Sequence, residues 1–286
     1  MKKFVILLSA VMMLSTALLF SSCTKKDDSS GKPVVAVSIV PQETFVKAVC
    51  GDKVEVITMI PPGSSPANYE PTPEQIENFS DCSVYFSIGV PTESANILPN
   101  AGDLNVVSLA EKAAAVYPER TFEGGGRDPH IWLSPKRVKV MIDAIAAEMS
   151  EIDPDNKDFY NENAQAYIAQ LDELDAEISA ALEGVENKKF IVYHPAFGYL
   201  ADDYGLEMFS LEEEGKEATP QHLEEMIDLA KDEDIKVIFY QAEVDSSQSK
   251  AYADEVGGKT MQLAPLSPDY IENFKNMANL MAEAME

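Results

Sequence analysis

Two histidines of this chain sit in segments where packing alone does not explain them. His130 lies within Asp128–Pro135 and His194 within Phe190–Tyr199, and the chain has only three histidines. Such an imidazole can bind a metal, act as a general base, or be a buried, hydrogen-bonded core residue. His194 directly follows an apolar run of strand type, and open α/β sheets present ligand-binding groups at the carboxyl ends of their strands. The sequence favours a ligand-lining role for both. A buried core histidine is the alternative for each, held by Asp128 in the case of His130.

The segments around these histidines alternate between strand-like and helix-like patterns, which predicts parallel sheets with crossover helices. The expected strands are Val34–Val40, Val54–Ile60, Ser83–Ile88, Leu104–Leu109, Lys189–Tyr193, Ile235–Tyr240 and Thr260–Leu263. The expected helices are Glu43–Cys50, one opened by Thr72 and Pro73, Pro135–Ser150, Pro220–Lys231, Ser247–Glu255 and Pro268–Glu286. The N-cap threonine, proline and glutamine at 72, 73 and 75 form a capping box.

One long helix is expected to interrupt this alternation. No glycine or proline lies between Pro154 and Gly184, and apolar residues from Tyr160 to Ala181 follow at spacings of four and three. This period predicts a single helix about 45 Å long. A coiled-coil surface has the same pattern, but the α/β pattern that resumes after Gly184 favours a strut between two lobes.

The expected fold is therefore α/β, with two lobes that each hold a parallel sheet flanked by helices, joined by one long rigid helix. The predicted boundaries are an N-terminal lobe at 34–152, a linking helix at 153–184 and a C-terminal lobe at 185–286. A long rigid strut also predicts limited closure of the lobes.

The first residues have the layout of a bacterial export signal. Lys2 and Lys3 precede the apolar run Phe4–Phe20, and two serines precede Cys23. A short apolar run with a basic start and a small-residue end is typical of a signal peptide rather than a membrane span. We predict a signal peptide at 1–22, acylation of Cys23 and a tether at 23–33, with plain secretion as the alternative. The protein would then be extracytoplasmic and lipid-anchored to the bacterial cell membrane.

Charge and cysteine content exclude some classes of function. The formal net charge is −27 at pH 7, and no basic patch with interleaved aromatic residues is present, so we expect no nucleic-acid partner. Cys50 closes a predicted helix and Cys82 opens a predicted strand, which favours two buried free thiols over a disulfide. No cysteine spacing of the metal-binding kind occurs.

The chain resembles the substrate-binding lipoproteins of zinc and manganese ABC importers, over residues 34–286. The segments that carry this resemblance are Pro61–Pro66, Tyr69–Pro73, Asp128–Pro135, His194–Tyr199 and Ala264–Leu266. The resemblance implies a monomer that receives a divalent metal ion, zinc or manganese, as cargo and passes it to an ABC permease in the membrane. It also implies a metal held between the lobes by three histidines and one carboxylate.

Only half of that implied ligand set is present in this chain. His130 and His194 occupy two of the histidine positions, whereas Ala67 and Ala264 stand where the resemblance implies a histidine and a carboxylate. A histidine-rich loop found in many zinc-specific members is replaced by residues 123–127. We expect the missing ligands to come from nearby oxygen or amide groups: Asn68 and Glu70 flank Ala67, while Gln241 and Glu243 follow a strand at a sheet's carboxyl edge. Two imidazoles with carboxylate oxygens and open positions would suit manganese or ferrous iron better than zinc.

The sequence leaves three alternatives to metal transport. The same fold could carry a metal chelate or a non-metal ligand in the space left by the two alanines. An enzyme would use His194 or His130 as a general base with Glu243 as its orienting group. However, the sequence has no nucleophile elbow, phosphate-binding glycine loop or paired catalytic carboxylates, so we predict no enzyme. An adhesion role is allowed by the lipid tether but specified by no residue.

The third histidine, His222, is expected on the surface.

Overall fold

The computed structural model describes residues 31–213, 216–243 and 247–285. The predicted signal peptide, Cys23 and most of the predicted tether lie outside these residues. Within them, Pro33–Glu286 belongs to one compact unit. None of the helices in the described ranges is long and apolar enough to cross a bilayer.

The chain from 33 onward contains two parallel four-stranded sheets, as the alternating pattern predicts. The first has the order β2-β1-β3-β4 and the second the order β6-β5-β7-β8. Every paired neighbour in both sheets is parallel. The strands are β1 (Val34–Val37), β2 (Glu55–Thr58), β3 (Val84–Ser87), β4 (Val106–Ser108), β5 (Lys189–Val192), β6 (Glu207–Ser210), β7 (Val237–Gln241) and β8 (Lys259–Leu263).

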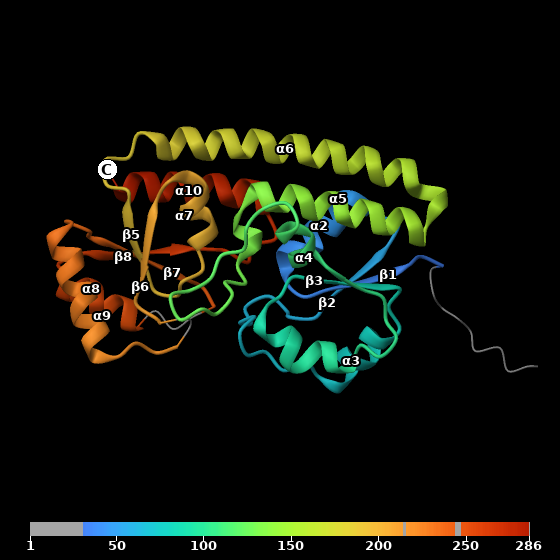
Figure 1. The fold of residues 1–286 in the computed structure, drawn as a ribbon, viewed down its shortest axis with the longest axis horizontal. Helices are drawn as coiled ribbons and strands as arrows, with labels where there is room; N and C mark the ends of the chain where they lie inside the picture. Colours follow the sequence, from blue (N-terminus) through green and yellow to red (C-terminus); the bar gives the residue numbers. More distant parts are fainter. Residues whose placement is uncertain (1–30, 214–215, 244–246, 286) are drawn as a thin grey trace, which may run out of the picture. The chain divides into compact units, whose positions relative to one another are not determined.

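Helices flank both sheets (Figure 1). The α-helices are α2 (Val40–Cys50), α3 (Pro73–Ser80), α4 (Leu109–Ala114), α5 (Pro135–Ile152), α6 (Lys157–Glu183), α7 (Gly198–Tyr204), α8 (Pro220–Asp232), α9 (Ser247–Glu255) and α10 (Tyr270–Met285). A π-helical turn (η1, Glu93–Ile97) and three 3₁₀ turns (η2, Leu98–Asn100; η3, Ile131–Leu133; η4, Pro154–Asn156) complete the described elements. The predicted Thr72 capping box is present, with the Gln75 amide donating to Thr72 Oγ1 and the Thr72 amide to Gln75 Oε1.

Several element boundaries differ from the sequence prediction. The first helix begins at Val40 rather than Glu43, because Pro41 in its first turn needs no amide hydrogen bond. The elements β6, α4 and α7 were not predicted; each is seven residues or shorter and carries too few periods to be recognised. The predicted single helix from 153 is a 3₁₀ turn at Pro154–Asn156 followed by α6.

Helix α6 joins the two sheet systems through its buried stripe. It contacts α5 and α2 of the first sheet's layer and α10 and α7 of the second's (Figure 1). The predicted stripe is confirmed except at its end, where Leu182 is buried and Ala181 is only half-buried. One hydrophobic core runs without a break from Val35 under α6 to Met285. This core includes residues on both sides of the predicted lobe boundaries, so it does not mark them, and the boundaries stay a prediction. Below, residues 34–152 are called the N-terminal half and residues 185–285 the C-terminal half.

Cys50 and Cys82 are both free and buried, as the sequence favoured. Burial raises the pKa of the Cys50 thiol to about 12 and that of Cys82 to about 11. Both are therefore unreactive core residues in the folded protein.

Direct hydrogen bonds also connect the halves. The indole of Trp132 donates to the Pro265 carbonyl at 2.9 Å, and the Tyr270 hydroxyl donates back to the Trp132 carbonyl at 2.7 Å. Asp203 on α7 forms a 3.2 Å ion pair with Arg137 on α5 and accepts from the Ser134 hydroxyl at 2.5 Å. Because both partners of this ion pair are nearly buried, the pair fixes α7 against α5.

We predict that Asp203→Ala lowers the free energy of unfolding by about 3–5 kcal/mol, because it leaves the guanidinium of Arg137 buried without its counter-charge. The matched control is Asp172→Ala, which removes an exposed partner of Lys139 and should cost no more than about 1 kcal/mol. Urea unfolding of both variants measures the difference. Equal losses in the two variants would show that Asp203 does not hold the halves together.

Candidate functional site

The segment that carries His130 is fixed by its neighbours on both sides. Ile131, Trp132 and Leu133 form the buried turn η3 directly after it, and Ser134 caps α5 by accepting from the Arg137 amide. His130 itself is only 8% exposed. The ring therefore has little freedom to change its orientation.

The fully buried Asp128 orients the His130 ring. Its Oδ1 accepts from the His130 amide at 3.0 Å and from ring Nδ1 at 2.8 Å, while its Oδ2 pairs with Arg120 at 3.1 Å. A carboxylate can only accept, so Nδ1 carries the proton and Nε2 keeps its lone pair. The core-histidine alternative is thus partly right, since His130 is buried and held by Asp128, but its Nε2 is left facing outward from that pair.

His194 has a matching arrangement in the other half. It follows β5 at the carboxyl edge of the second sheet, and its Nδ1 lies 2.6 Å from Oε2 of Glu212. Glu212 follows β6, the strand beside β5, and its amide donates to the Tyr193 carbonyl at 2.9 Å. Glu212 was not predicted as a site residue, because β6 has only four residues and was not predicted either. A glutamate two residues after a parallel neighbour of β5 is the signal that would have identified it.

The structure brings the two predicted histidines together. Their Nε2 atoms are 3.3 Å apart and their ring centroids 5.2 Å apart, with an angle of 79° between the ring planes. With both Nδ1 protons donated to carboxylates, two neutral rings would direct their Nε2 lone pairs at one another. A cation or a proton between them would remove that repulsion, so the pair is suited to binding a positively charged guest.

The other predicted ligands are placed less closely. Asn68 and Glu70 are exposed on the loop before α3, whose backbone is held by Thr92 and Asn96. No contact recorded among the described residues joins either side chain to His130 or His194. Ala67 is exposed and Ala264 half-buried, and neither offers a side-chain donor.

Gln241 and Glu243 are placed differently. Gln241 ends β7, the other neighbour of β5, and is 7% exposed with a carboxamide nitrogen that is buried without a partner. Glu243 has one buried carboxylate oxygen without a partner, and burial raises the pKa of this carboxyl. Buried polar atoms without partners are costly. The free carboxylate oxygen makes Glu243 the better candidate for an additional contact to a cation, whereas the free carboxamide nitrogen of Gln241 is a hydrogen-bond donor.

The side chains alone do not complete a metal site. In the part of the chain that the structure describes, no group of three or more His, Cys, Asp or Glu residues is arranged to hold a metal ion. The third histidine, His222, is not on the open surface as predicted; it is half-buried and its Nε2 lies 2.9 Å from the Ser210 carbonyl.

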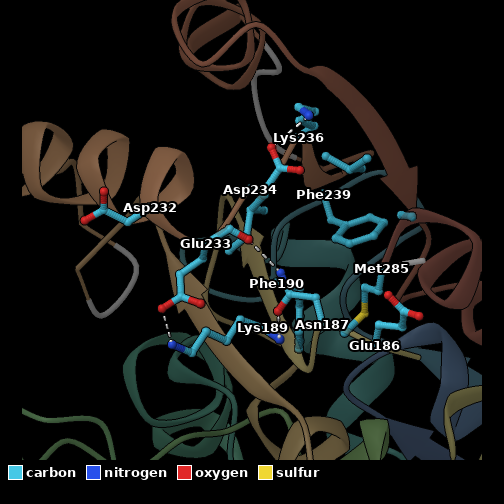
Figure 2. Close-up of a pocket in the computed structure, with 13 residues that line it drawn as sticks. Glu186, Asn187, Lys189, Phe190, Asp232, Glu233, Asp234, Lys236, Phe239 and Met285 are labelled. Atoms are coloured by element: carbon cyan, nitrogen blue, oxygen red, sulfur yellow. Dashed lines mark hydrogen bonds and ion pairs between the residues drawn. The ribbon is translucent and has the colours of Figure 1, made fainter. Parts of the chain in front are cut away.

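A cavity of about 680 Å³ lies at the opposite edge of the second sheet (Figure 2). Its wall includes Lys189 at the start of β5, whereas His194 follows the end of that strand. Two ion pairs lie within its wall: Lys189 with Glu233 at 2.6 Å and Lys236 with Asp234 at 2.8 Å. This cavity is therefore separate from the histidine pair.

Three comparisons relate the chain to known proteins. The family described as zinc-uptake complex component A, periplasmic (ZnuA) matches residues 35–284. The high-affinity zinc uptake system protein ZnuA of Bacillus subtilis is 31% identical over 91% of this chain and 86% of its own length. The manganese ABC transporter substrate-binding lipoprotein PsaA of Streptococcus mitis is 28% identical over 88% of this chain and 84% of its own. A crystal structure of ZnuA superposes with a TM-score of 0.83 at 34% identity, covering 89% of this chain and all of the other.

The burial of His130 predicts a pH dependence of stability in metal-free protein. Burial is the largest influence on the pKa of His130 and lowers it, against the opposing effect of Asp128. The unfolded chain therefore binds a proton at this residue at a higher pH than the folded chain does. The free energy of unfolding should fall as pH drops below about 6.5, by at most about 1.4 kcal/mol per pH unit from this group.

His130→Gln should remove that part of the fall. Urea unfolding in the presence of a chelator at pH 7, 6 and 5 compares the two proteins. An equally steep fall in the variant would mean that His130 is not held neutral by its surroundings.

Proposed function

We propose a function for this chain from the family to which it belongs, the zinc-uptake complex component A family of periplasmic proteins. The chain is the extracytoplasmic substrate-binding component of an ABC importer. It captures a divalent metal ion, zinc or manganese, between its two halves and delivers the ion to a membrane permease. Relatives named for zinc and for manganese support both ions as cargo.

The separation of the two imidazoles is the observation that carries this proposal. Zinc binds imidazole nitrogen at about 2.0–2.1 Å in tetrahedral sites, which places two such nitrogens about 3.3 Å apart. The Nε2 atoms of His130 and His194 are 3.3 Å apart. The two rings therefore have the spacing that one shared ion requires, before any movement of the halves.

The carboxylates behind the rings support the same role. Metal-binding histidines commonly donate their second ring proton to a carboxylate, which fixes the tautomer and makes the binding nitrogen more basic. Asp128 does this for His130 and Glu212 for His194. One such pair is ordinary in a protein core, but two pairs that meet nitrogen to nitrogen support a shared binding site.

The remaining coordination positions are filled by oxygen or amide groups and by water. Glu243 is the preferred protein donor, because one of its carboxylate oxygens is buried without a partner. Gln241 would contribute through its amide oxygen, because an amide nitrogen donates hydrogen bonds and does not bind a cation. Asn68 and Glu70 require the loop before α3 to move toward the rings. Two nitrogen ligands with oxygen donors and open positions lower the advantage of zinc over manganese.

The attachment to the membrane follows from the first residues and from the names of relatives. Acylation of Cys23 after removal of residues 1–22 would anchor a monomeric chain outside the cytoplasmic membrane, where a permease can be reached through the tether. A related lipoprotein of Streptococcus mitis supports this location. The binding and delivery of an ion requires no catalysis, so we assign no enzymatic activity.

Calorimetric titration of metal-free protein with zinc and with manganese, each in turn, tests the proposal. We expect saturable binding of one ion per chain for at least one metal. At a free metal concentration of about 100 times Kd, the folded state should gain about 2.7 kcal/mol. The double variant His130→Ala/His194→Ala should lose this thermal stabilisation.

His222→Ala is the matched control, because it removes the third histidine without touching the pair. It should keep both the titration curve and the metal-dependent stabilisation. Stabilisation that persists in the double variant, or that is lost equally in the control, would place the ion elsewhere in the chain.

A further inference from the structure

Arg120 connects the support of His130 to the half of the chain that carries His194. It stands at the start of a short hairpin, 120–128, in which the Asp128 amide donates to the Arg120 carbonyl at 2.9 Å. Its guanidinium donates from Nη1 to Asp128 and pairs through Nε with Asp202 on α7, at 3.1 and 3.2 Å. Asp128 belongs to the N-terminal half and Asp202 to the C-terminal half. A single side chain thus spans the boundary beside the two rings.

The backbone and the neighbouring tyrosine strengthen the same connection. The Arg120 amide donates to the Tyr199 hydroxyl at 2.9 Å, and that hydroxyl donates to the Asp128 carbonyl at 3.3 Å. Tyr199 and Asp202 both lie on α7, which starts four residues after His194. The position of α7 relative to Asp128 therefore also sets the position of His194 relative to His130.

Gly198 makes room for this contact. The Arg120 guanidinium occupies the space of a side chain at Gly198: a Cβ there would meet Nη1, so a methyl group would overlap it. Gly198 is the first residue of α7 and needs no left-handed backbone. Glycine is therefore needed at this position to leave space for the guanidinium, and not because the backbone adopts a left-handed conformation.

We propose that Arg120 is a positioning residue for the metal site, which sets the separation of the two imidazoles by fixing Asp128 to α7. It touches neither ring and acts through Asp128 on one side and through α7 on the other. The effect on metal binding rests on the proposed function. The effect on the separation of the two rings applies to the metal-free protein as well.

Two variants disturb the connection in different ways. Arg120→Gln removes the charge that pairs with buried Asp128, and it therefore also changes stability. Gly198→Ala keeps every charge and displaces only the guanidinium. Arg127→Gln is the matched control: Arg127 lies in the same hairpin but pairs with Glu119 and donates to the Gly89 carbonyl, both in the N-terminal half.

The first measurement is the nuclear magnetic resonance of the three histidine rings in metal-free protein. Arg120→Gln and Gly198→Ala should shift the ring signals of both His130 and His194 and leave those of His222 in place. Arg127→Gln should shift neither His130 nor His194. The separation of the rings is decisive, because their Nε2 atoms lie 3.3 Å apart and any displacement of His130 also changes the surroundings of His194. The nuclear Overhauser effects between the two rings should therefore weaken in both test variants. Unchanged effects between the rings in both test variants overturn the inference.

The second measurement is the Kd for zinc and manganese from competition with a metal-binding dye. Removal of the partners that orient a ligand typically weakens binding about 10–100-fold, and we expect about tenfold or more in both test variants and no change in Arg127→Gln. Unchanged Kd values with shifted rings would overturn the claim that the spacing governs affinity. If the unmodified protein binds neither metal while the ring signals respond as expected, the proposed function fails and the positioning role stands.

Discussion

The site depends on how firmly the two halves are held against each other, because each half supplies one imidazole. A pair of nitrogens 3.3 Å apart can share an ion only if neither half drifts by a fraction of that distance. The continuous core beneath α6, the Trp132–Pro265–Tyr270 hydrogen bonds and the Asp203–Arg137 ion pair all limit such movement. The rings thus meet because of burial and charge pairing outside the site, and the site itself adds two carboxylates that set the ring tautomers.

The two halves supply their imidazoles from different kinds of structure. The second parallel sheet places His194 and Glu212 beyond the carboxyl ends of the neighbouring strands β5 and β6. Their side chains lie past the strand pairing and are therefore available to form a site. The opposite half supplies His130 from a turn locked by Asp128 rather than from a strand. An ion between the rings would therefore contact one rigid group from each half, which is consistent with the limited closure expected from a long strut.

Much of the fold could be predicted from the sequence because its signals are long. The stripe from Tyr160 to Ile178 spans about five helical turns. At the start of α3, the residues at 72, 73 and 75 all indicate a helix N-terminus. The short elements β6 and α7 could not be predicted, since each has too few residues for a period to emerge. Missing β6 meant missing Glu212, and missing α7 hid the contact of Arg120 with Asp202. The two histidines could be singled out from their unusual settings, but their spacing depends on packing between halves that no local pattern encodes.

X-ray absorption spectroscopy of the zinc-loaded protein tests the central claim most directly, since it counts imidazole ligands and reports their distance from the metal. Our account predicts scattering from two imidazoles at about 2.0–2.1 Å, together with oxygen donors. A bound ion with no imidazole, or with only one, would contradict the assignment of the shared guest to His130 and His194.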